Sequence, residues 1–523
     1  MVTQFPLTRA NVGPIVSFVG GAARAMTETI DTIATEEGLD PQDWDAMRRL
    51  GHSVVDDLVS TLQHVRERPV WRTVPDGSRA FLSRPLPLEP RDPAAVYDDV
   101  RQHVLPYPTG NLHPRFWGWV MGTGSPLAMF AEMLAAGLNW NVGGFDDSAS
   151  LVEDQVLGWC KQIMGFPADA SGLFVSGGSM ANFVGLAVGR DARAGADVRR
   201  RGVASLLANP VLYASRETHS SVVKAAELLG LGTEAVRLLP VDTQYRIDLD
   251  ALRAQVAAAR AAGLHPFAVV GNAGTVNTGA IDDLNALADI AAREGLWFHV
   301  DGAFGALARL HPDLAPLVSG IERADSLAFD LHKWGYLPVE AGCVLVRDVR
   351  AHRDAFAVKT AAYLRPEHGG PSARLEKFSD LGVQLSRGFR ALKAWMSFQE
   401  HGALKLGRIV RQNVEQARYL ARLVEAAPEL ELAAPVPLNV VCFRHRGERG
   451  APVAEQDELN REILVRLQES GEAVPSGTVV GGRFALRAAI TNHRSRRSDF
   501  DLLVRATLRA AEAVRDARVS RGA

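Results

Sequence analysis

The feature that most constrains the fold is an alternation of short apolar runs and helix-like segments between residues 120 and 350. Several of the apolar runs have no polar interruption, which is typical of strands covered on both faces. Two of the helix-like segments end in glycine, a common helix terminator. The pattern predicts an α/β fold with a mostly parallel seven-stranded sheet and helices on both faces. The expected strands are LFVSGG, PVLYAS, EAVRLLP, FAVVGNAG, LWFHVDGA, DSLAFDLH and GCVLVRD.

The regions on either side of this pattern predict two smaller units. Residues 1–125 contain helix-like segments, the Pro-rich connector SRPLPLEPRDP and the aromatic run LHPRFWGWV, and we expect them to wrap around the body. Residues 126–392 contain the α/β pattern. Residues 393–523 begin with a long helical pattern and include the strand-like runs LNVVCFRH and RFALRAAI, so they predict a small α+β domain.

The overall composition argues against several classes of function. The 523 residues carry 58 Lys and Arg against 60 Asp and Glu, so no basic surface is expected to attract nucleic acid. The three cysteines form no CxxC pair, which argues against a disulfide framework and a zinc site and fits a reducing cytoplasm. The apolar stretch VGPIVSFVGGAARA near the N-terminus is short for a bilayer span, so we expect no membrane insertion.

Two reactive side chains follow consecutive strand patterns. Asp301 ends the run LWFHVDGA, and a carboxylate at the carboxyl edge of a parallel strand lies where open α/β sheets bind ligands. Lys333 follows DSLAFDLH, the next strand pattern along the chain. Most lysines are solvated surface charges, but a lysine shielded in a cleft can attack a carbonyl carbon as the free amine. We therefore expect one cleft to hold both groups.

A Gly-rich turn supplies a candidate phosphate site. In FVSGGSMANFVGL, Gly177 and Gly178 precede a helix pattern that starts near Ser179. Glycine lets the backbone come close to a ligand, and the free N–H groups of a helix start suit a dianion. The turn lacks the lysine of a P-loop. It also departs from the GxSxG pattern of serine hydrolases at Ala181.

Two further strand ends carry polar side chains. His219 follows PVLYAS, where its ring could stack on a flat heteroaromatic ring, hydrogen-bond to a substrate carboxylate or cap a helix. Thr275 and Asn277 lie at another strand end, beside small residues that leave room for a ring. A phosphate cradle, a stacking histidine, a strand-end carboxylate and a strand-end amine are the four groups that pyridoxal phosphate requires.

The residues that supply these groups lie in motifs that resemble a known family. HVDGAFG, DLHKW, SGGSMAN and THSS are similar to motifs of the group II pyridoxal-phosphate-dependent decarboxylases, which include aromatic amino acid, tyrosine, tryptophan and glutamate decarboxylases. The similarity runs from about residue 45 to near the C-terminus, through HPRFWGW, QLSRGFRALKAW and LRAAITNHR. The resemblance implies fold type I, a homodimer with active sites at the subunit interface, and an N-terminal segment that wraps the partner.

The resemblance also implies roles for individual residues. Lys333 would bond to the cofactor's aldehyde, Asp301 would pair with the pyridine nitrogen, and Ala303 and His219 would pack on the ring. Relatives often have asparagine or serine near position 330, where an aspartate would repel a phosphate unless it is turned away. The expected cofactor-binding residues are Gly178, Ser179, His219, Thr275, Asp301, Ala303, Asp330, His332 and Lys333.

The reaction type depends on a loop tyrosine. In the decarboxylases this tyrosine closes over the partner's site and delivers a proton, whereas related aldehyde synthases have phenylalanine there. Tyr363 in AAYLRP therefore favours decarboxylation of an amino acid to its amine and carbon dioxide, with Lys333, His219 and Asp301 as the other catalytic residues. An aminotransferase, an aldehyde synthase and a non-catalytic homodimer that uses the cofactor for structure remain alternatives.

The substrate is expected to be an aromatic amino acid such as tyrosine, dopa, phenylalanine or tryptophan. Phe116, Trp119 and Val120 lie in the segment that lines the substrate pocket in relatives, and we expect them to contact the substrate. Ser386 and Arg387 are the other expected substrate-binding residues. Ser386 stands where plant relatives with serine take phenolic substrates and those with glycine take indolic ones.

Three charged residues allow more than one class of substrate. Asp146 and Asp147 could instead meet a cationic side chain, which would indicate a non-aromatic substrate. Arg487 in FALRAAI is suited either to binding a carboxylate or to stabilising the small domain.

Overall fold

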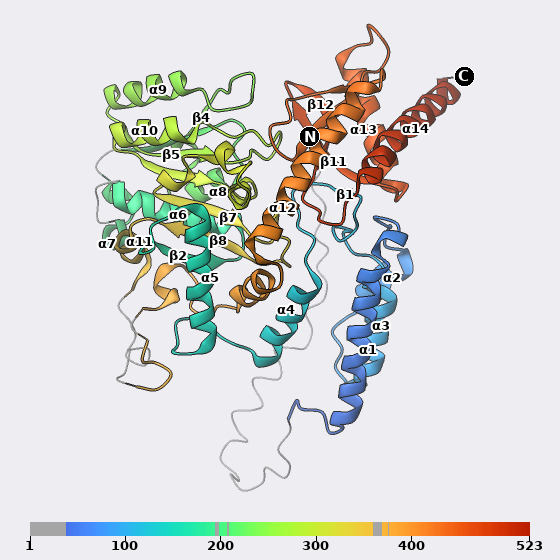
Figure 1. The fold of residues 1–523 in the computed structure, drawn as a ribbon, viewed down its shortest axis with the longest axis horizontal. Helices are drawn as coiled ribbons and strands as arrows, with labels where there is room; N and C mark the ends of the chain where they lie inside the picture. Colours follow the sequence, from blue (N-terminus) through green and yellow to red (C-terminus); the bar gives the residue numbers. More distant parts are fainter. Residues whose placement is uncertain (1–37, 194–197, 207–208, 359–368, 375, 523) are drawn as a thin grey trace, which may run out of the picture. The chain divides into compact units, whose positions relative to one another are not determined.

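A sheet of seven strands forms the centre of the α/β region (Figure 1). The computed structural model describes residues 38–193, 198–206, 209–358, 369–374 and 376–522. The strand order is β2-β8-β7-β6-β5-β3-β4; β8 pairs antiparallel with both of its neighbours, and the other pairs are parallel. All seven strands lie at the predicted runs: β2 (Ser171–Val175), β3 (Pro210–Ser215), β4 (Val236–Leu239), β5 (His265–Asn272), β6 (Trp297–Asp301), β7 (Ser326–Asp330) and β8 (Gly342–Val346). The predicted mostly parallel α/β sheet is confirmed.

Helices cover both faces of this sheet, which explains why several of its strands are buried along their whole length. Residues of β2, β6, β7 and β8 are buried at every position. One pair of helices is α6 (Gly178–Arg193) with α8 (Ser221–Leu228), and a second pair is α9 (Leu249–Ala261) with α10 (Leu284–Glu294). The connections that contain the first pair run along the sheet toward β4, and those that contain the second pair run back from β4. Because right-handed crossovers in opposite directions lie on opposite faces of a sheet, the two pairs cover opposite faces.

A second sheet contains the C-terminal strands and one short strand from the N-terminal part of the chain. Its order is β1-β11-β12-β10-β9. The strand β1 (Phe116–Trp117) pairs parallel with β11 (Val474–Val480), so the aromatic run is anchored to the C-terminal region. The predicted runs appear as β10 (Val440–His445) and β12 (Arg483–Ala489), whereas β1, β9 (Leu430–Leu432) and β11 were not predicted. The helices that accompany this sheet are α12 (Arg390–Ala426), α13 (Val453–Glu469) and α14 (Arg497–Gly522).

The N-terminal helices are α1 (Trp44–Gln63), α2 (Asp76–Leu82) and α3 (Pro93–His103), followed by α4 (Pro126–Leu138) and α5 (Ser148–Met164). No helix in the part of the chain that the structure describes is both long and apolar enough to cross a membrane. The apolar stretch at residues 12–25 lies outside the described residues. The domain boundaries at 125/126 and 392/393 stay predictions; α12 runs across the second of them, with a kink at Gly402.

A buried ion pair joins α5 to the segment before α12. The guanidinium of Arg387 pairs with Glu153, and the two side chains are 1% and 0% exposed. Arg387 also donates hydrogen bonds to the backbone oxygens of Val142 (2.6 Å) and Phe174 (2.8 Å). Burial raises the pKa of Glu153, so the arginine is what stabilises its charge. All of these partners belong to the protein core, and Arg387 does not reach the cavity where we expected it to contact substrate.

Candidate active site

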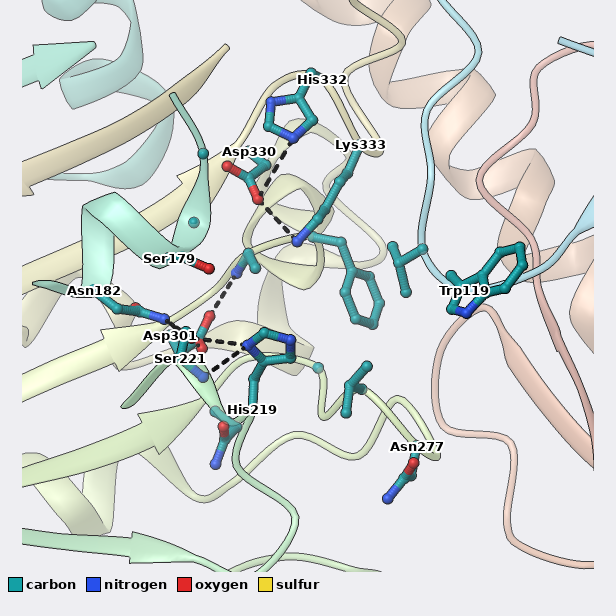
Figure 2. Close-up of a pocket in the computed structure, with 18 of the residues that line it drawn as sticks. Trp119, Ser179, Asn182, His219, Ser221, Asn277, Asp301, Asp330, His332 and Lys333 are labelled. Carbon is teal, nitrogen blue, oxygen red and sulfur yellow. Dashed lines mark hydrogen bonds and ion pairs between the residues drawn. The ribbon is translucent and has the colours of Figure 1, made fainter. Parts of the chain in front are cut away.

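A cavity of about 610 Å³ lies at the carboxyl ends of the parallel strands (Figure 2). Asp301 closes β6 and Asp330 closes β7, and Lys333 follows three residues later. The start of α6 forms the wall beside Asp330. The second sheet closes the opposite side through residues of β11 and through Arg487 of β12. The cavity is therefore built by both sheets, and the sequence prediction that Asp301 and Lys333 share one cleft agrees with this arrangement.

Lys333 forms an ion pair inside the cavity. Its Nζ lies 2.8 Å from Oδ2 of Asp330, whose side chain is 1% exposed. His332 Nε2 lies 3.9 Å from the same oxygen (Figure 2). The backbone N–H of Ala341 donates to His332 Nδ1, so the hydrogen of a neutral ring is on Nε2. Burial lowers the pKa of His332, which favours this neutral form.

The Gly-rich turn comes into direct contact with this pair. A Cβ at Gly178 would lie 2.8 Å from Oδ2 of Asp330, and a Cβ at Gly177 would lie 3.3 Å from Cε1 of His332. A side chain at Gly178 would force Asp330 to move, and one at Gly177 would be in tight contact with His332. Because α6 begins at Gly178, its first backbone N–H groups are free to bind a ligand at this wall. The turn therefore has the geometry of a phosphate cradle, and Asp330 is directed at it rather than turned away.

Asp301 is held by an amide that the sequence had not singled out. Asn182, in the first turns of α6, donates from Nδ2 to Oδ2 of Asp301 at 2.9 Å and to Oγ of Ser221 at 2.9 Å. The N–H of Ala303 donates to the other carboxylate oxygen, Oδ1, at 3.1 Å. Donors to both oxygens stabilise the ionised carboxylate. Asp301 can therefore accept a further bond from a protonated ring nitrogen.

The orientation of Asn182 is fixed from within the sheet. His299 of β6 lies 2.9 Å from Oδ1 of Asn182 through Nε2 and 2.8 Å from Oγ of Ser326 through Nδ1. Trp297 donates from Nε1 to the same serine oxygen at 2.8 Å. The hydrogen bonds of this network can all be directed toward Asp301. Trp297 donates to Ser326, Ser326 can donate to His299, and His299 can donate to Asn182. Burial lowers the pKa of His299 to about 4, which keeps the ring neutral with its hydrogen on Nε2.

His219 lies beside Asp301 on the floor of the cavity (Figure 2). The N–H of Ser221 donates to its Nδ1 at 3.2 Å, and the hydroxyl of Ser221 lies 2.8 Å from the same nitrogen. The neutral ring therefore carries its hydrogen on Nε2. Burial lowers the pKa of His219, an effect that the nearby charge of Asp301 partly opposes. The ring can stack on a planar ligand and still donate one hydrogen bond.

The other expected site residues divide into two groups. Those that line the cavity are Trp119, Val120, Gly178, Ser179, Asn277, Ala303 and His332. Four of the expected residues do not line it. Thr275 bonds to Thr278 and to the N–H of Ala280, and so shapes the turn after β5. Phe116 is buried against Val70 and Val474, Ser386 lines a second cavity, and Arg387 is in the buried ion pair. Tyr363 lies outside the described residues.

The cavity matches the chemistry of pyridoxal phosphate. The α6 turn offers backbone N–H groups for a phosphate, and Asp301 offers a fully supported carboxylate for a ring nitrogen. His219 offers a flat ring for stacking. The Nζ of Lys333 is 2.8 Å from Asp330 and reaches the cavity. These four groups would hold the cofactor, and Ala303 leaves room for its ring.

The comparisons with known proteins identify the family. The conserved domain of pyridoxal-dependent decarboxylases matches residues 75–446. The chain belongs to the pyridoxal-dependent decarboxylase family. An aromatic-L-amino-acid decarboxylase of Bacillus atrophaeus is 34% identical over 459 residues, covering 86% of this chain and 92% of that protein. A phenylacetaldehyde synthase of Arabidopsis thaliana is 30% identical over 469 residues, covering 86% and 93%. The crystal structure of Oryza sativa TDC with PLP and tryptamine has a TM-score of 0.84 at 28% identity, covering 91% and 100%.

Family membership confirms several of the sequence predictions. The chain is a pyridoxal-phosphate-dependent amino acid decarboxylase, a carboxy-lyase with the type I fold. Its cofactor is pyridoxal phosphate, with which neighbours of this fold have been solved. The resemblance to group II decarboxylases is likewise confirmed. The sequence alone had not singled out Asn182, Ser221, His299 or Ser326. Asn182 lies inside the quoted SGGSMAN motif, and His299 begins HVDGAFG, so their positions in motifs were the available signal.

Replacing Asn182 by alanine should weaken binding of pyridoxal phosphate. The substitution removes a donor to a buried carboxylate and leaves His299 without its acceptor. Hydrogen bonds to charged groups contribute about 1.5–3 kcal/mol, so we expect a Kd increase of about ten- to a hundredfold. Titrating the cofactor-free protein with pyridoxal phosphate measures this. Asn285→Ala, at an exposed amide bonded to Ser319, is the control. Equal affinity of the Asn182 variant and the wild type would contradict the role of the amide.

Replacing His299 by glutamine should make the fold less sensitive to acid. An unfolded histidine titrates near pH 6.5, whereas burial holds the pKa of His299 at about 4. Between these values the unfolded chain binds a proton that the fold excludes, so the free energy of unfolding falls as the pH is lowered. This histidine accounts for roughly 3 kcal/mol of that fall. Glutamine can keep the bond to Asn182 without titrating. Denaturant unfolding at pH 7 and pH 4.5 should show a smaller loss in the variant, and an equal loss would refute the assignment.

Proposed function

We propose that this decarboxylase converts an aromatic L-amino acid to its amine and carbon dioxide. The observation that carries the proposal is that Trp119, Val120 and Phe304 line the cavity. Large apolar and aromatic side chains suit a substrate with an aromatic ring. The first relatives compared include aromatic-L-amino-acid, tryptophan and tyrosine decarboxylases, which supports the same substrate class.

The acidic side chains of the site favour this class over a cationic substrate. Asp301 and Asp330 are the carboxylates among the described lining residues, and each already has a donor or an ion-pair partner. Asp147 caps the start of α5 by accepting from the N–H of Ser150 at 2.8 Å. Neither Asp146 nor Asp147 lines the cavity in this chain. A cationic side chain would therefore find no free carboxylate on the described walls.

Arg487 provides a candidate anchor for the substrate carboxylate. It lines the cavity at 3% exposure, and its Nη2 has no hydrogen-bond partner among the described residues. Its Nη1 donates to the backbone oxygen of Trp119 at 2.9 Å, and its Nε donates to that of Asn277 at 3.1 Å. Burial lowers the pKa of Arg487 to about 10, so it stays charged at neutral pH. Its Nη1 also donates to the hydroxyl of Ser476 at 3.3 Å. A buried guanidinium whose partners among the described residues include no carboxylate is suited to an anionic ligand.

The protein's part in the reaction follows from these positions. When bound, pyridoxal phosphate supplies an aldehyde that takes up an amine and a ring that withdraws electrons. Asp301, supported by Asn182 and Ala303, holds a proton on the ring nitrogen. Lys333 provides the amine, and Arg487 orients the substrate carboxylate. The walls of the cavity exclude water from the reacting atoms. Tyr363 delivers the proton that completes the amine.

An aldehyde synthase is the second candidate, because a phenylacetaldehyde synthase is among the relatives at 30% identity. The two activities differ in products. A decarboxylase gives one amine for each carbon dioxide, a synthase gives hydrogen peroxide and ammonia, and an aminotransferase gives a 2-oxo acid. Tyr363 favours the decarboxylase, since synthases have phenylalanine at that position.

Carbon dioxide release from each of the twenty amino acids and from dopa tests the substrate class. We expect release from tryptophan, tyrosine, phenylalanine or dopa at a rate at least about tenfold above that from lysine or glutamate, because the apolar wall lacks a free charge for either side chain. Amine and hydrogen peroxide are measured in the same samples. Preferred turnover of glutamate or a diamino acid would reject the aromatic substrate, and peroxide in place of amine would favour the synthase.

Replacing Tyr363 by phenylalanine tests the proton donor. We expect amine formation to fall by about a hundredfold or more, since a positioned acid contributes that order of rate. Binding of pyridoxal phosphate should be unchanged because the described groups that would hold the cofactor, among them Gly178 and Asp301, are not altered. Tyr107→Phe serves as a matched control outside the cavity. Unchanged amine formation in the Tyr363 variant would refute its role.

We also propose that the protein is a homodimer whose subunits meet at α4. Three apolar side chains of this helix are exposed, namely Met133, Leu134 and Leu138. Val383 and Leu385, in the segment before α12, are exposed as well. A surface with this many large apolar side chains is typical of a protein interface.

Sedimentation measures the oligomeric state directly. The wild-type protein should sediment as a species of twice the 56.5 kDa chain mass. Leu138→Arg should shift it toward the monomer by at least about tenfold in dissociation constant, because a charge cannot be buried there without cost. Val519→Arg, at an exposed position of α14, should have no effect. A monomeric wild type, or a dimer unaffected by the Leu138 change, would contradict the proposal.

A further inference from the structure

The buried carboxylate of Asp330 has no role in the proposed reaction, and its negative charge lies where the phosphate of the cofactor is expected. Its carboxylate ends β7 at 1% exposure, and Oδ1 accepts no hydrogen bond from the described residues. The same carboxylate faces the Gly-rich turn, 2.8 Å from where a Cβ of Gly178 would lie and 3.9 Å from that of Gly177. These are the glycines whose N–H groups would cradle the phosphate of the cofactor. A buried carboxylate and a phosphate dianion would then share one wall.

The cation that now balances Asp330 is the one that the cofactor takes. Lys333 Nζ lies 2.8 Å from Oδ2 of Asp330. This nitrogen is also the amine that the cofactor's aldehyde requires. Once it is used there, Asp330 cannot depend on a free ammonium group, while the phosphate adds negative charge beside it. Two like charges at close range in a buried site strongly favour protonation of one of them.

The other titratable groups around Asp330 do not supply a replacement cation. His332 Nε2 is 3.9 Å away, and burial lowers the pKa of this histidine. His219 is likewise shifted toward its neutral form. On the neighbouring strands, β6 contributes the carboxylate of Asp301, and β8 contributes Cys343, whose pKa burial raises so that the thiol stays neutral. At the start of α6, the lining side chains are uncharged.

We propose that Asp330 takes up and keeps one proton when the cofactor binds and that the neutral acid donates a hydrogen bond to the phosphate. The step forms one O–H bond, on the unpartnered Oδ1, with a proton from solvent. In the cofactor-free protein the carboxylate is charged and holds Lys333 in place. In the loaded protein it is an uncharged hydrogen-bond donor of the phosphate cradle. Asp330 is therefore a positioning residue whose charge depends on the cofactor, whatever amino acid is the substrate.

Calorimetric titration of the cofactor-free protein with pyridoxal phosphate measures this proton. Repeating the titration in buffers of different ionisation enthalpy at pH 7.5 gives the number of protons bound per site. We expect the wild type to take up about one proton more than Asp330→Asn, because asparagine already donates from an amide. By linkage, the ratio of the wild-type Kd to the variant Kd should rise by about tenfold per pH unit between pH 6.5 and 8.5. Equal proton counts in the two proteins would overturn the proposal.

Three controls assign the proton to Asp330 beside the phosphate. Asp325→Asn changes a largely buried carboxylate at the other end of the same β7 region and should keep the wild-type proton count. Pyridoxal, which lacks the phosphate, should give no difference between wild type and Asp330→Asn. His332→Gln should keep the extra proton. Loss of the proton in the His332 variant, or a difference that persists with pyridoxal, would place it elsewhere and refute the proposal.

Phosphorus NMR of the loaded wild-type protein distinguishes a proton on Asp330 from a proton on the phosphate itself. We expect a shift typical of the dianion from pH 6.5 to 8.5, in both the wild type and Asp330→Asn. A monoanionic phosphate in the wild type alone would show that the proton is on the ligand, and would reject a neutral Asp330.

Discussion

The carboxamide of Asn182 is the group on which the geometry of the site depends. It accepts a hydrogen bond from His299 and donates to both Asp301 and Ser221, and Ser221 in turn holds His219. Because every neighbour is committed to one role, the amide cannot be reversed without leaving buried groups unpaired. One side chain from the start of α6 therefore fixes both the carboxylate and the imidazole that face the cavity.

The two sheets contribute different groups to the cavity. The large sheet presents the groups that would bind the cofactor in the proposed reaction, at the carboxyl ends of its strands. The second sheet contributes Arg487 and brings in the aromatic segment around Trp119, because β1 pairs with β11. This pairing joins residues more than 350 positions apart. In the proposed reaction, substrate recognition would depend on a contact between distant parts of the chain, whereas cofactor recognition would depend on strand ends within one sheet.

This division explains what the sequence could predict. The seven strands of the large sheet were recognisable because helices cover both faces and leave continuous apolar runs, and strand ends then place Asp301 and Lys333 together. Short strands such as β1 carry no periodic signal. The roles of Asn182 and His299 were not predicted, because a polar residue in a helix or strand pattern gives no sign in the sequence of the side chain that it will contact. Arg387 was predicted to bind substrate. The sequence could not reveal its buried ion pair, because Glu153 lies 234 positions away.

We propose that Lys333 is the amine that bonds to pyridoxal phosphate. Borohydride reduction of the loaded protein, followed by tryptic digestion and mass spectrometry, identifies the modified lysine. Modification of Lys333 blocks cleavage at that position, so we expect a peptide spanning residues 324–347 that carries the mass of the reduced cofactor. An unmodified and fully cleaved site at Lys333, with the added mass on a different lysine or on none, would contradict this role of Lys333.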